Sequence, residues 1–293
     1  ENISSLLTAA IEKRISVADV PVGVLLSGGL DSSLITAISK KYKNNLNTYS
    51  IGFETINNEE GNEFHYSDMV ANDLKTLHEK YSVTSFDLLN SLDDVITSMS
   101  EPMFSQDSSA FYLLAKNVSK SSKVVLSGQG ADEVFGGYFW YEKIMNETNL
   151  NSIDTLSKYY FDRSYENFKT IVHSDFINEN YASNDIGSRL KQMDPSLSIL
   201  DKIFRLELSM FIIDDPVKRV DNMTMSHSLE ARVPFLDIDL ISFMLSIESE
   251  KKIENGEKCL LKEVSKKYLN NKIINREKFY FPVPPLKIIK DKF

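Results

Sequence analysis

A short apolar run that leads straight into a glycine turn and then a helix is the feature that most constrains this fold. Residues 22–26 are apolar or glycine, residues 27–33 read Ser-Gly-Gly-Leu-Asp-Ser-Ser, and apolar residues then recur at helical spacing over 34–38. Glycines allow the backbone to approach an anion closely, and the first N–H groups of a helix can donate to phosphate oxygens. Ligands of open α/β sheets bind at the carboxyl ends of strands. The segment therefore predicts a phosphate-binding loop in an α/β protein.

The residues of this loop indicate which phosphates it contacts. No lysine follows the glycines, so the loop is not the Gly-Lys-Ser/Thr loop of proteins that transfer a γ-phosphate. It is similar to the Ser-Gly-Gly-x-Asp-Ser loop of enzymes that split ATP between the α and β phosphates, and five fixed residues match by chance at about one position in a million. The structural alternative is a glycine turn in which Asp31 caps a helix. The loop residues expected to contact ATP are Ser27, Gly28, Gly29, Asp31 and Ser32.

A second glycine-rich loop follows another apolar run, at residues 124–126. Residues 127–133 read Ser-Gly-Gln-Gly-Ala-Asp-Glu. Mg²⁺ in nucleotide sites is usually bound by one or two carboxylates together with phosphate oxygens. Asp31 and Asp132, one on each loop, are therefore candidate Mg²⁺ ligands, whereas the structural alternative is a turn whose acidic residues only cap a helix.

The order of the apolar runs predicts the fold class. Up to residue 135, short apolar runs alternate with helical patterns, as in an α/β protein with a parallel sheet. Beyond Tyr138 the pattern becomes aromatic-rich and helical. We expect an ATP-binding α/β core over residues 1–140 and a mainly helical lobe over 141–293, with the site in the cleft between them. The expected strands are 22–26, 47–53, 78–83 and 124–127, and the expected helices are 3–15, 30–42, 63–74, 86–98 and 110–120.

Charge and composition argue against several classes of function. The formal net charge of −9 and the pI near 5.1 argue against nucleic-acid binding, which usually needs a basic face. No apolar run of 18 or more residues predicts a membrane span. The single cysteine, Cys259, gives neither a disulfide framework nor a cysteine metal site, which fits a reducing cytoplasm. Because the sequence starts at Glu1 without an export signal, we interpret the chain as a piece of a longer or processed protein.

The two glycine loops together resemble the asparagine synthetase family, and two later blocks extend the resemblance over nearly the whole chain. Residues 219–237 read Arg-Val-Asp-Asn-Met-Thr-Met-Ser-His-Ser-Leu-Glu-Ala-Arg-Val-Pro-Phe-Leu-Asp, and residues 256–262 read Gly-Glu-Lys-Cys-Leu-Leu-Lys. The resemblance implies a pyrophosphate-loop ATP site with ATP and Mg²⁺ as cofactors. The further residues that it assigns to ATP are Leu26, Ile51, Ser127 and Gly128.

The resemblance also assigns residues to catalysis. Lys258 matches the catalytic lysine of the family, whose charge can stabilise negative charge that develops on pyrophosphate or on a tetrahedral intermediate. The alternative for Lys258 is an ordinary solvated surface lysine. Arg232 lies in a block that could position the nucleotide or the substrate, whereas the alternative for Glu230 and Asp237 in the same block is a buried ion pair. Cys259 fits a packed thiol better than a nucleophile.

Gln129 departs from the pattern of the family. Many asparagine synthetases have an acidic residue at this position, which the family links to amide formation, and a glutamine cannot act as a base. The loop 127–133 and the segments 101–103 and 280–284 are most similar to the branch that amidates N-acetylglutaminylglutamine. Family members carry an amino-terminal glutaminase domain that is absent from this chain, so we expect it in the full-length protein and expect this chain to use free ammonia. A homodimer also fits the resemblance.

The reaction that the resemblance implies has two steps. Mg-ATP adenylates a small-molecule carboxylate with release of pyrophosphate, and ammonia then displaces AMP to form an amide. A β-lactam synthetase-like cyclase would use the same adenylation but an internal amine. A tRNA-thiolating enzyme shares the first loop, although the acidity of the chain and its single cysteine count against it. A non-catalytic regulator would bind the nucleotide alone.

Overall fold

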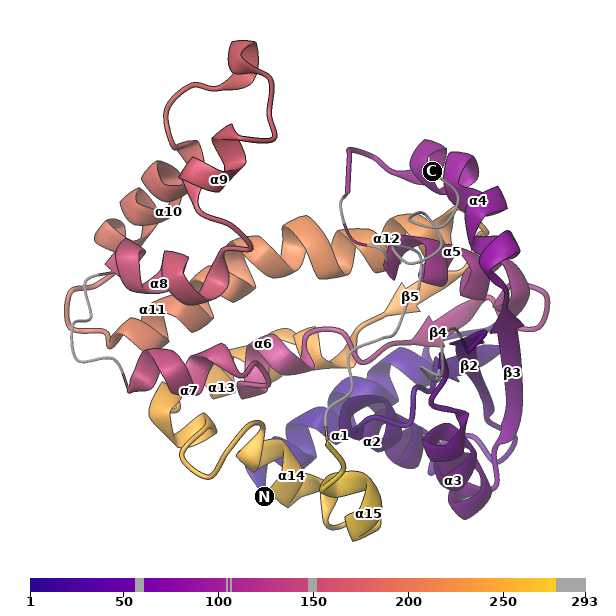
Figure 1. Cartoon of the computed structure of the whole chain (residues 1–293). Helices are drawn as coiled ribbons and strands as arrows, with labels where there is room; N and C mark the ends of the chain where they lie inside the picture. The colour runs from indigo at the N-terminus through magenta and orange to yellow at the C-terminus, as the bar shows by residue number, and fades with distance from the viewer. Residues whose placement is uncertain (56–60, 104, 106, 147–151, 278–293) are drawn as a thin grey trace.

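A five-stranded parallel sheet forms the centre of the fold (Figure 1). The structure is a computed structural model, and it describes residues 1–55, 61–103, 105, 107–146 and 152–277. The strands lie in the order β3-β2-β1-β4-β5, so the predicted α/β class with a parallel sheet is confirmed. Their bounds are β1 (Val22–Leu25), β2 (Asn47–Phe53), β3 (Leu77–Val83), β4 (Val124–Leu126) and β5 (Glu230–Arg232).

Helices cover both faces of β1, the middle strand. All four residues of β1 are buried. Val22 and Val24 pack in one apolar cluster with α1 (Asn2–Ser16) and α2 (Leu30–Ser39). Leu25 packs on the other face with α5 (Asp107–Val118). This arrangement explains why β1 is continuously apolar, since parallel strands are usually buried on both faces.

The first half of the chain forms the elements that the sequence predicts. Each of the four predicted strands and five predicted helices is found, with ends shifted by at most three residues. The start of α4 has a clear local cause, because the Thr84 hydroxyl accepts from the Asp87 N–H while the Asp87 carboxylate accepts from the Thr84 N–H. The remaining helices of this half are α3 (Phe64–Leu74), α4 (Ser85–Ser98) and α6 (Ala131–Phe135).

The second half of the chain is mainly helical, as predicted, and has an apolar core of its own. Tyr141 and Phe204 stack in that core with ring centroids 4.7 Å apart. The helix that begins at Ile199 continues through π-helical turns toward the sheet, where it contacts α5 (Figure 1). The helices are α7 (Trp140–Met145), α8 (Ser152–Tyr160), α9 (Tyr165–Lys169), η1 (Ser174–Phe176), α10 (Tyr181–Gln192), α11 (Ile199–Leu206), η2 (Glu207–Phe211), η3 (Ile213–Val217), α12 (Lys218–Met225), η4 (Pro234–Leu236), α13 (Ile238–Leu245), η5 (Ser249–Lys252), α14 (Cys259–Ser265) and α15 (Asn271–Ile274).

The fifth strand comes from the second half of the chain and was not predicted. β5 pairs with β4, so that Val125 lies opposite Ala231 and Leu126 lies opposite Arg232. Its sequence is Glu-Ala-Arg, which is short and carries two charged residues, so it has none of the apolar patterning that identifies a strand. The chain therefore adds one more strand to the sheet after the helices α7 to α12.

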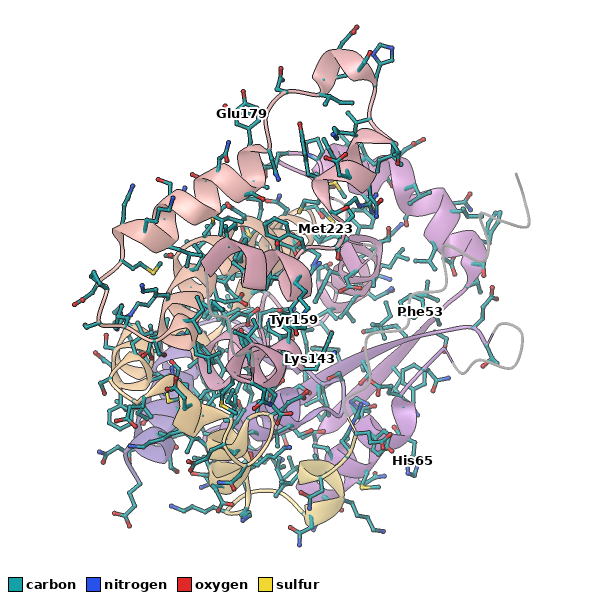
Figure 2. All side chains as sticks on the ribbon, turned by 60° about the vertical axis from the view of Figure 1, so that its left-hand side comes forward. Phe53, His65, Lys143, Tyr159, Glu179 and Met223 are labelled. Carbon is teal, nitrogen blue, oxygen red and sulfur yellow. The ribbon has the colours of Figure 1, made fainter. Side chains whose placement is uncertain are left out.

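A buried apolar cluster fixes the returning segment to the sheet. It contains Phe53 of β2 and Met223 of α12, which are labelled in Figure 2 and are 170 positions apart in the chain. Glu179 lies on the arm that contains α9 and α10, which projects away from the sheet (Figures 1 and 2). The predicted non-helical segment 281–285 lies outside the described residues. Among the described helices, none is long and apolar enough to cross a membrane.

Candidate active site

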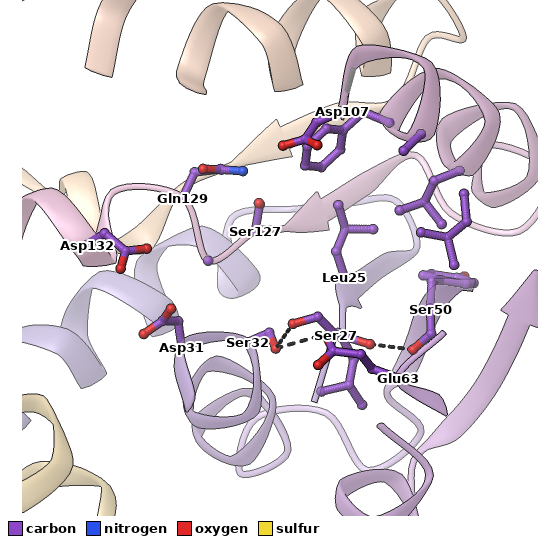
Figure 3. Close-up of a pocket in the computed structure, with 17 residues that line it drawn as sticks. Leu25, Ser27, Asp31, Ser32, Ser50, Glu63, Asp107, Ser127, Gln129 and Asp132 are labelled. Atoms are coloured by element: carbon purple, nitrogen blue, oxygen red, sulfur yellow. Dashed lines mark hydrogen bonds between the residues drawn. The ribbon is translucent and has the colours of Figure 1, made fainter. Parts of the chain in front are cut away.

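A pocket lies at the carboxyl ends of β1, β2 and β4, where the two glycine loops meet (Figure 3). We call it the strand-end pocket, and its volume is about 270 Å³. The first loop and its strand contribute Leu26, Ser27, Asp31 and Ser32. The second loop contributes Ser127, Gly128, Gln129 and Asp132, and β2 contributes Ile51. The structure thus brings together nine of the residues that the sequence singled out, from positions 26 to 132.

A second cavity of about 450 Å³ adjoins the first and contains the basic residues of the site. We call it the lysine pocket, because Lys258 and Lys262 line it together with Arg276. Both pockets share Ser27 and Asp31. The strand-end pocket therefore adjoins a cavity of mixed charge, in which three basic side chains that could contact phosphates lie among five carboxylates.

Hydrogen bonds between hydroxyl groups fix the first loop. The Oγ atoms of Ser27 and Ser32 form a hydrogen bond of 3.0 Å, and the Ser27 N–H donates to Ser32 Oγ at 3.2 Å (Figure 3). Gly28 lines neither pocket, but its φ of +76° is in the left-handed region, and a Cβ there would lie 2.5 Å from the backbone nitrogen of Ser67. Only glycine fits this turn without strain. Gly29 is the N-cap residue of α2, so Asp31 does not cap that helix.

Lys258 lies between the two predicted metal ligands. Its Nζ is 2.7 Å from Asp31 Oδ2 and 2.9 Å from Asp132 Oδ1, and its side chain is only 8% exposed. Burial alone would lower the pKa of Lys258, but the two carboxylates outweigh it, so the pKa is raised above its ordinary value. The alternative of a solvated surface lysine is therefore wrong. Gly137 makes room for the group, because a Cβ there would lie 2.0 Å from Asp132 Oδ1.

The carboxylates around Lys258 fit a divalent cation that is also bound by phosphate. Asp31 and Asp132 come from different loops and converge on one cation, the ammonium of Lys258. The described residues contain no group of three or more metal-ligating side chains that could hold a metal ion alone. Two carboxylates that need phosphate oxygens to complete the shell are the usual donor set for Mg²⁺. Asp31 and Asp132 are thus the residues that would hold Mg²⁺ with a nucleotide.

Comparison with known proteins identifies the family that shares these loops. The family model described as asparagine synthase matches residues 2–291. The chain belongs to the asparagine synthase family. It is 29% identical to asparagine synthetase [glutamine-hydrolyzing] 1 of Bacillus subtilis over 91% of this chain, and 30% identical to asparagine synthetase [glutamine-hydrolyzing] 3 of the same organism over 96%. A similar protein of Sandersonia aurantiaca is 27% identical over 93% of the chain.

The match to the asparagine synthase family covers only part of each relative. The alignments with the two Bacillus subtilis proteins span 47% and 48% of their lengths, so the chain spans about half the length of the curated relatives it matches. A U34-tRNA thiolase of Methanococcus maripaludis overlaps with 94% of this chain and 91% of its own, at 15% identity and a TM-score of 0.34. That score is too low to bear on function.

Arg232, the third residue that the family resemblance assigned to catalysis, does not bring its side chain to either pocket. Its Nε donates to Glu230 at 2.7 Å, and its Nη1 donates to the Arg14 carbonyl. Its own carbonyl accepts from the Ser127 N–H at 2.9 Å, so it contributes to the second loop through the backbone. Asp237 pairs with Arg14 at 2.8 Å. Asp237, whose side chain is 7% exposed, is thus in a buried ion pair, as the structural alternative predicted, whereas the side chain of Glu230 is 55% exposed and its pair with Arg232 is not buried.

Cys259 is a packed thiol, as predicted. It is buried, and its Sγ lies 3.0 Å from the Lys252 carbonyl and 3.3 Å from the Lys251 carbonyl. It immediately follows Lys258 at the start of α14. The thiol therefore helps to fix the segment that carries the lysine.

Sequence reasoning missed two residues that tie the end of the chain to the first loop. Arg276 Nη1 donates to the Gly28 carbonyl at 3.0 Å, and its Nη2 pairs with the Glu63 carboxylate, which lines both pockets. Burial raises the pKa of Glu63 despite this partner. Arg276 opens a block, residues 276–285, that resembles the family, but the resemblance gives it no role, and 213 positions separate it from Glu63. No local signal in the sequence could have joined them.

Asp107 was also missed, although it lines the strand-end pocket. It stands in the first turn of α5, and Figure 3 shows its carboxylate on the side of the pocket where Gln129 lies. The sequence signal was weak, because an acidic residue at the start of a helix is common for reasons of the helix dipole alone.

Proposed function

We propose that this chain is the ATP-dependent synthetase region of an amide-forming enzyme. In the first step a carboxylate attacks the α-phosphate of ATP to give an acyl-adenylate and pyrophosphate. In the second step ammonia attacks the acyl carbon and AMP leaves. The observation that carries the proposal is the meeting of Lys258 with Asp31 and Asp132 beside the two glycine loops.

Different residues of the pocket would bind the nucleotide and stabilise charge in the adenylation step. Apolar side chains such as Ile51 and Phe111 would hold the adenosine, and the hydroxyls and N–H groups of the first loop would donate to phosphate oxygens. Mg²⁺ held by Asp31 and Asp132 would neutralise charge on the phosphates. Lys258 would stabilise the negative charge that grows on the departing pyrophosphate.

Gln129 supports an acceptor other than free aspartate. It lines the pocket at the position where many family members have an acid, and its amide offers both a donor and an acceptor but no charge. We propose an acceptor acid with an amide or peptide-like group, such as an N-acetylated glutamine dipeptide. A site built around such a hydrogen bond can reject analogues that lack the group by about 10⁴-fold. The names of the relatives indicate that those proteins hydrolyse glutamine, and glutamine would be the source of ammonia for the reaction here as well.

A pyrophosphate-release screen tests this function. The purified chain is given ATP, Mg²⁺ and ammonium with aspartate, glutamine dipeptides and related acids, and the products are identified by mass spectrometry. We expect acid-dependent release of pyrophosphate and an amide product for a peptide-like acid. ATP binding without acid-dependent release would favour a non-catalytic regulator. Release with a cyclic product that needs no ammonium would favour a β-lactam synthetase-like cyclase, and efficient conversion of aspartate alone would show that Gln129 does not set the acceptor.

A further inference from the structure

Amide formation at this site needs a group that accepts a proton, and Gln129 cannot be that group. When ammonia attacks an acyl-adenylate, a C–N bond forms, the bond from carbon to the AMP oxygen breaks, and the nitrogen must lose a proton to become a neutral amide. Ammonia is also mainly ammonium at neutral pH and must lose a proton before it can attack. An amide side chain has no basic site for either transfer. The proton acceptor must therefore be sought among the other groups of the strand-end pocket.

Three of the four described carboxylates in that pocket already have a close cationic partner. Asp31 and Asp132 are bound to the Lys258 ammonium at 2.7 and 2.9 Å. Glu63 forms a close ion pair with Arg276. Protonating any of them would break an ion pair that also holds a loop of the site, which makes them poor proton acceptors during turnover.

Asp107 is the fourth carboxylate, and its cationic partner is shared and distant. Among the described residues its partner is Arg219, whose Nη2 lies 3.9 Å from Asp107 Oδ2, beyond hydrogen-bond distance. The same guanidinium is 3.2 Å from Asp215 through Nη1, and its buried Nε has no hydrogen-bond acceptor among the described residues. Arg219 therefore places a positive charge near Asp107 without donating a hydrogen bond to its oxygens. The carboxylate is 29% exposed and lines the same pocket as Gln129 (Figure 3).

The electrostatic environment of Asp107 suits a proton acceptor. Burial raises the pKa of Asp107 above its usual range, the Arg219 charge opposes this, and the Asp215 charge adds to it. A general base works best when its pKa is closer to the working pH than that of an exposed carboxylate. These are the charged groups that face Asp107 from its neighbours, α12 and η3.

We propose that Asp107 is the general base of the amide-forming step, receiving on its carboxylate the proton that the attacking nitrogen loses. The inference rests on the proposed function, because it assumes the acyl-adenylate. The proton moves from nitrogen to Asp107 as the C–N bond forms, AMP leaves with the electron pair of the broken C–O bond, and Asp107 returns its proton to solvent through the open side of the pocket. Asp107 would thus supply, from α5, the basic group that the second loop lacks.

Two half-reactions of the Asp107→Asn variant test the proposal. Adenylation is followed by acid-dependent exchange of labelled pyrophosphate into ATP, and amide formation by product with ammonium. We expect exchange to stay within about 3-fold of the wild type, because asparagine keeps the shape of the aspartate side chain, whereas amide formation falls by about 10²–10⁴-fold, the usual contribution of a general base. The residual rate should rise about tenfold per pH unit, following the fraction of free ammonia.

Hydroxylamine in place of ammonium separates proton transfer from a structural effect. Hydroxylamine is mostly unprotonated at neutral pH, so it needs less help from a base. We expect the deficit of Asp107→Asn to shrink by at least about tenfold with hydroxylamine. Asp107→Glu, which keeps the carboxylate, should recover part of the activity with ammonium.

Asp214→Asn is the matched control, because it removes a neighbouring carboxylate of η3 that pairs with Lys218 rather than with Arg219 and lies outside both pockets. It should leave both half-reactions unchanged. Equal losses in Asp107→Asn and Asp214→Asn, an equal loss of exchange and amide formation, or a deficit as large with hydroxylamine as with ammonium would each overturn the role of Asp107. A wild-type chain without exchange for any acid would overturn the proposed function, and this inference with it.

Discussion

The two glycine loops follow neighbouring strands and look alike in sequence, but they are held in different ways. The first loop is fixed by the hydroxyls of Ser27 and Ser32 and by Arg276 on its Gly28 carbonyl. The second loop leads into the short helix α6, which is flanked by two left-handed glycines, Gly130 at φ +90° and Gly136 at φ +74°. Hydroxyls and N–H groups favour an anion, whereas the second loop offers carboxylate and amide groups. Under the proposed function, the first loop would donate to phosphates and supply Asp31 to the metal, and the second would present Asp132 to the metal and Gln129 to the acceptor.

Lys258 connects the two loops, and the largest expected effects come from its carboxylate partners. Asp31→Asn and Asp132→Asn should each abolish pyrophosphate release, by at least about 10³-fold, because one lost electrostatic contact in an active site already costs about 10²–10³-fold. The measurement is steady-state pyrophosphate release with circular dichroism as a check on folding. Asp93→Asn, in the exposed part of α4, is the control. Turnover like that of the wild type in either loop variant would remove the metal assignment.

The next prediction concerns whether the charge of Lys258 stabilises the transition state or the bound substrate. Lys258→Ala should lower kcat by about 10²–10³-fold and change the KM for ATP far less, because the charge of the lysine is needed where negative charge develops. Steady-state kinetics over a range of ATP concentrations give both constants. Lys262→Ala, in the same pocket, should affect kcat much less. A change confined to KM would assign Lys258 to ground-state binding.

A glycine pair tests how tightly the second loop is packed. Gly137→Ala should lower the free energy of unfolding by about 1–3 kcal/mol, because its Cβ would lie 2.0 Å from Asp132 Oδ1 and 2.2 Å from Lys258 Cε. Gly187→Ala, in α10, meets atoms no closer than 3.7 Å and should stabilise the protein by about 0.5–1 kcal/mol. Urea unfolding of both variants gives the comparison. Equal effects would mean that the loop relaxes around the added methyl group.

The last prediction concerns a buried acidic group behind the second loop. Burial raises the pKa of Glu207 to about 8, and Tyr141 and Tyr160 donate to its two oxygens at 3.0 and 2.9 Å. The folded state therefore keeps a proton that the unfolded state loses above about pH 4.3. Stability should fall as pH rises from about 4.3 to 8, by at most about 1.4 kcal/mol per pH unit.

Glu207→Gln should remove that part of the pH dependence and leave the variant relatively more stable at pH 8 than at pH 5. Thermal unfolding of wild type and variant at several pH values measures the difference. The exposed Glu254→Gln variant is the control, with a slope like that of the wild type. A slope unchanged in Glu207→Gln would show that another group dominates the pH dependence.

The sequence predicted the parts of the site that are local in the chain. Each glycine loop follows its strand directly, so the placement of Asp31 and Asp132 at one edge of the sheet follows from the parallel order of the strands. The buried position of Lys258 beside them could be expected only from the family resemblance, because Asp132 and Lys258 are 126 positions apart in the chain.

Contacts between distant segments could not be predicted in the same way. β5 was missed because its pairing with β4 depends on Leu229 and Ala231 fitting an existing apolar surface rather than on a pattern of its own. The position of the Arg232 side chain could not be predicted for the same reason. Side chains alternate between the two faces of a strand, and on β5 this places the Arg232 side chain against Glu230 and the Arg14 carbonyl. Whether Asp107 or Gln129 meets a substrate depends on the shape of a pocket, which a single sequence does not specify.

The contact of Arg276 with Gly28 also has a consequence for how the protein is made. These two residues are 248 positions apart, and Lys258 reaches Asp31 across 227 positions. During synthesis the first four strands and their helices can assemble while both cations of the site are still missing, since domains begin to fold as they emerge. Closing such long loops is slow compared with forming local structure. The first four strands of the nascent chain can therefore pair well before the loops of the site receive Lys258 and Arg276, which lie close to the end of the described residues.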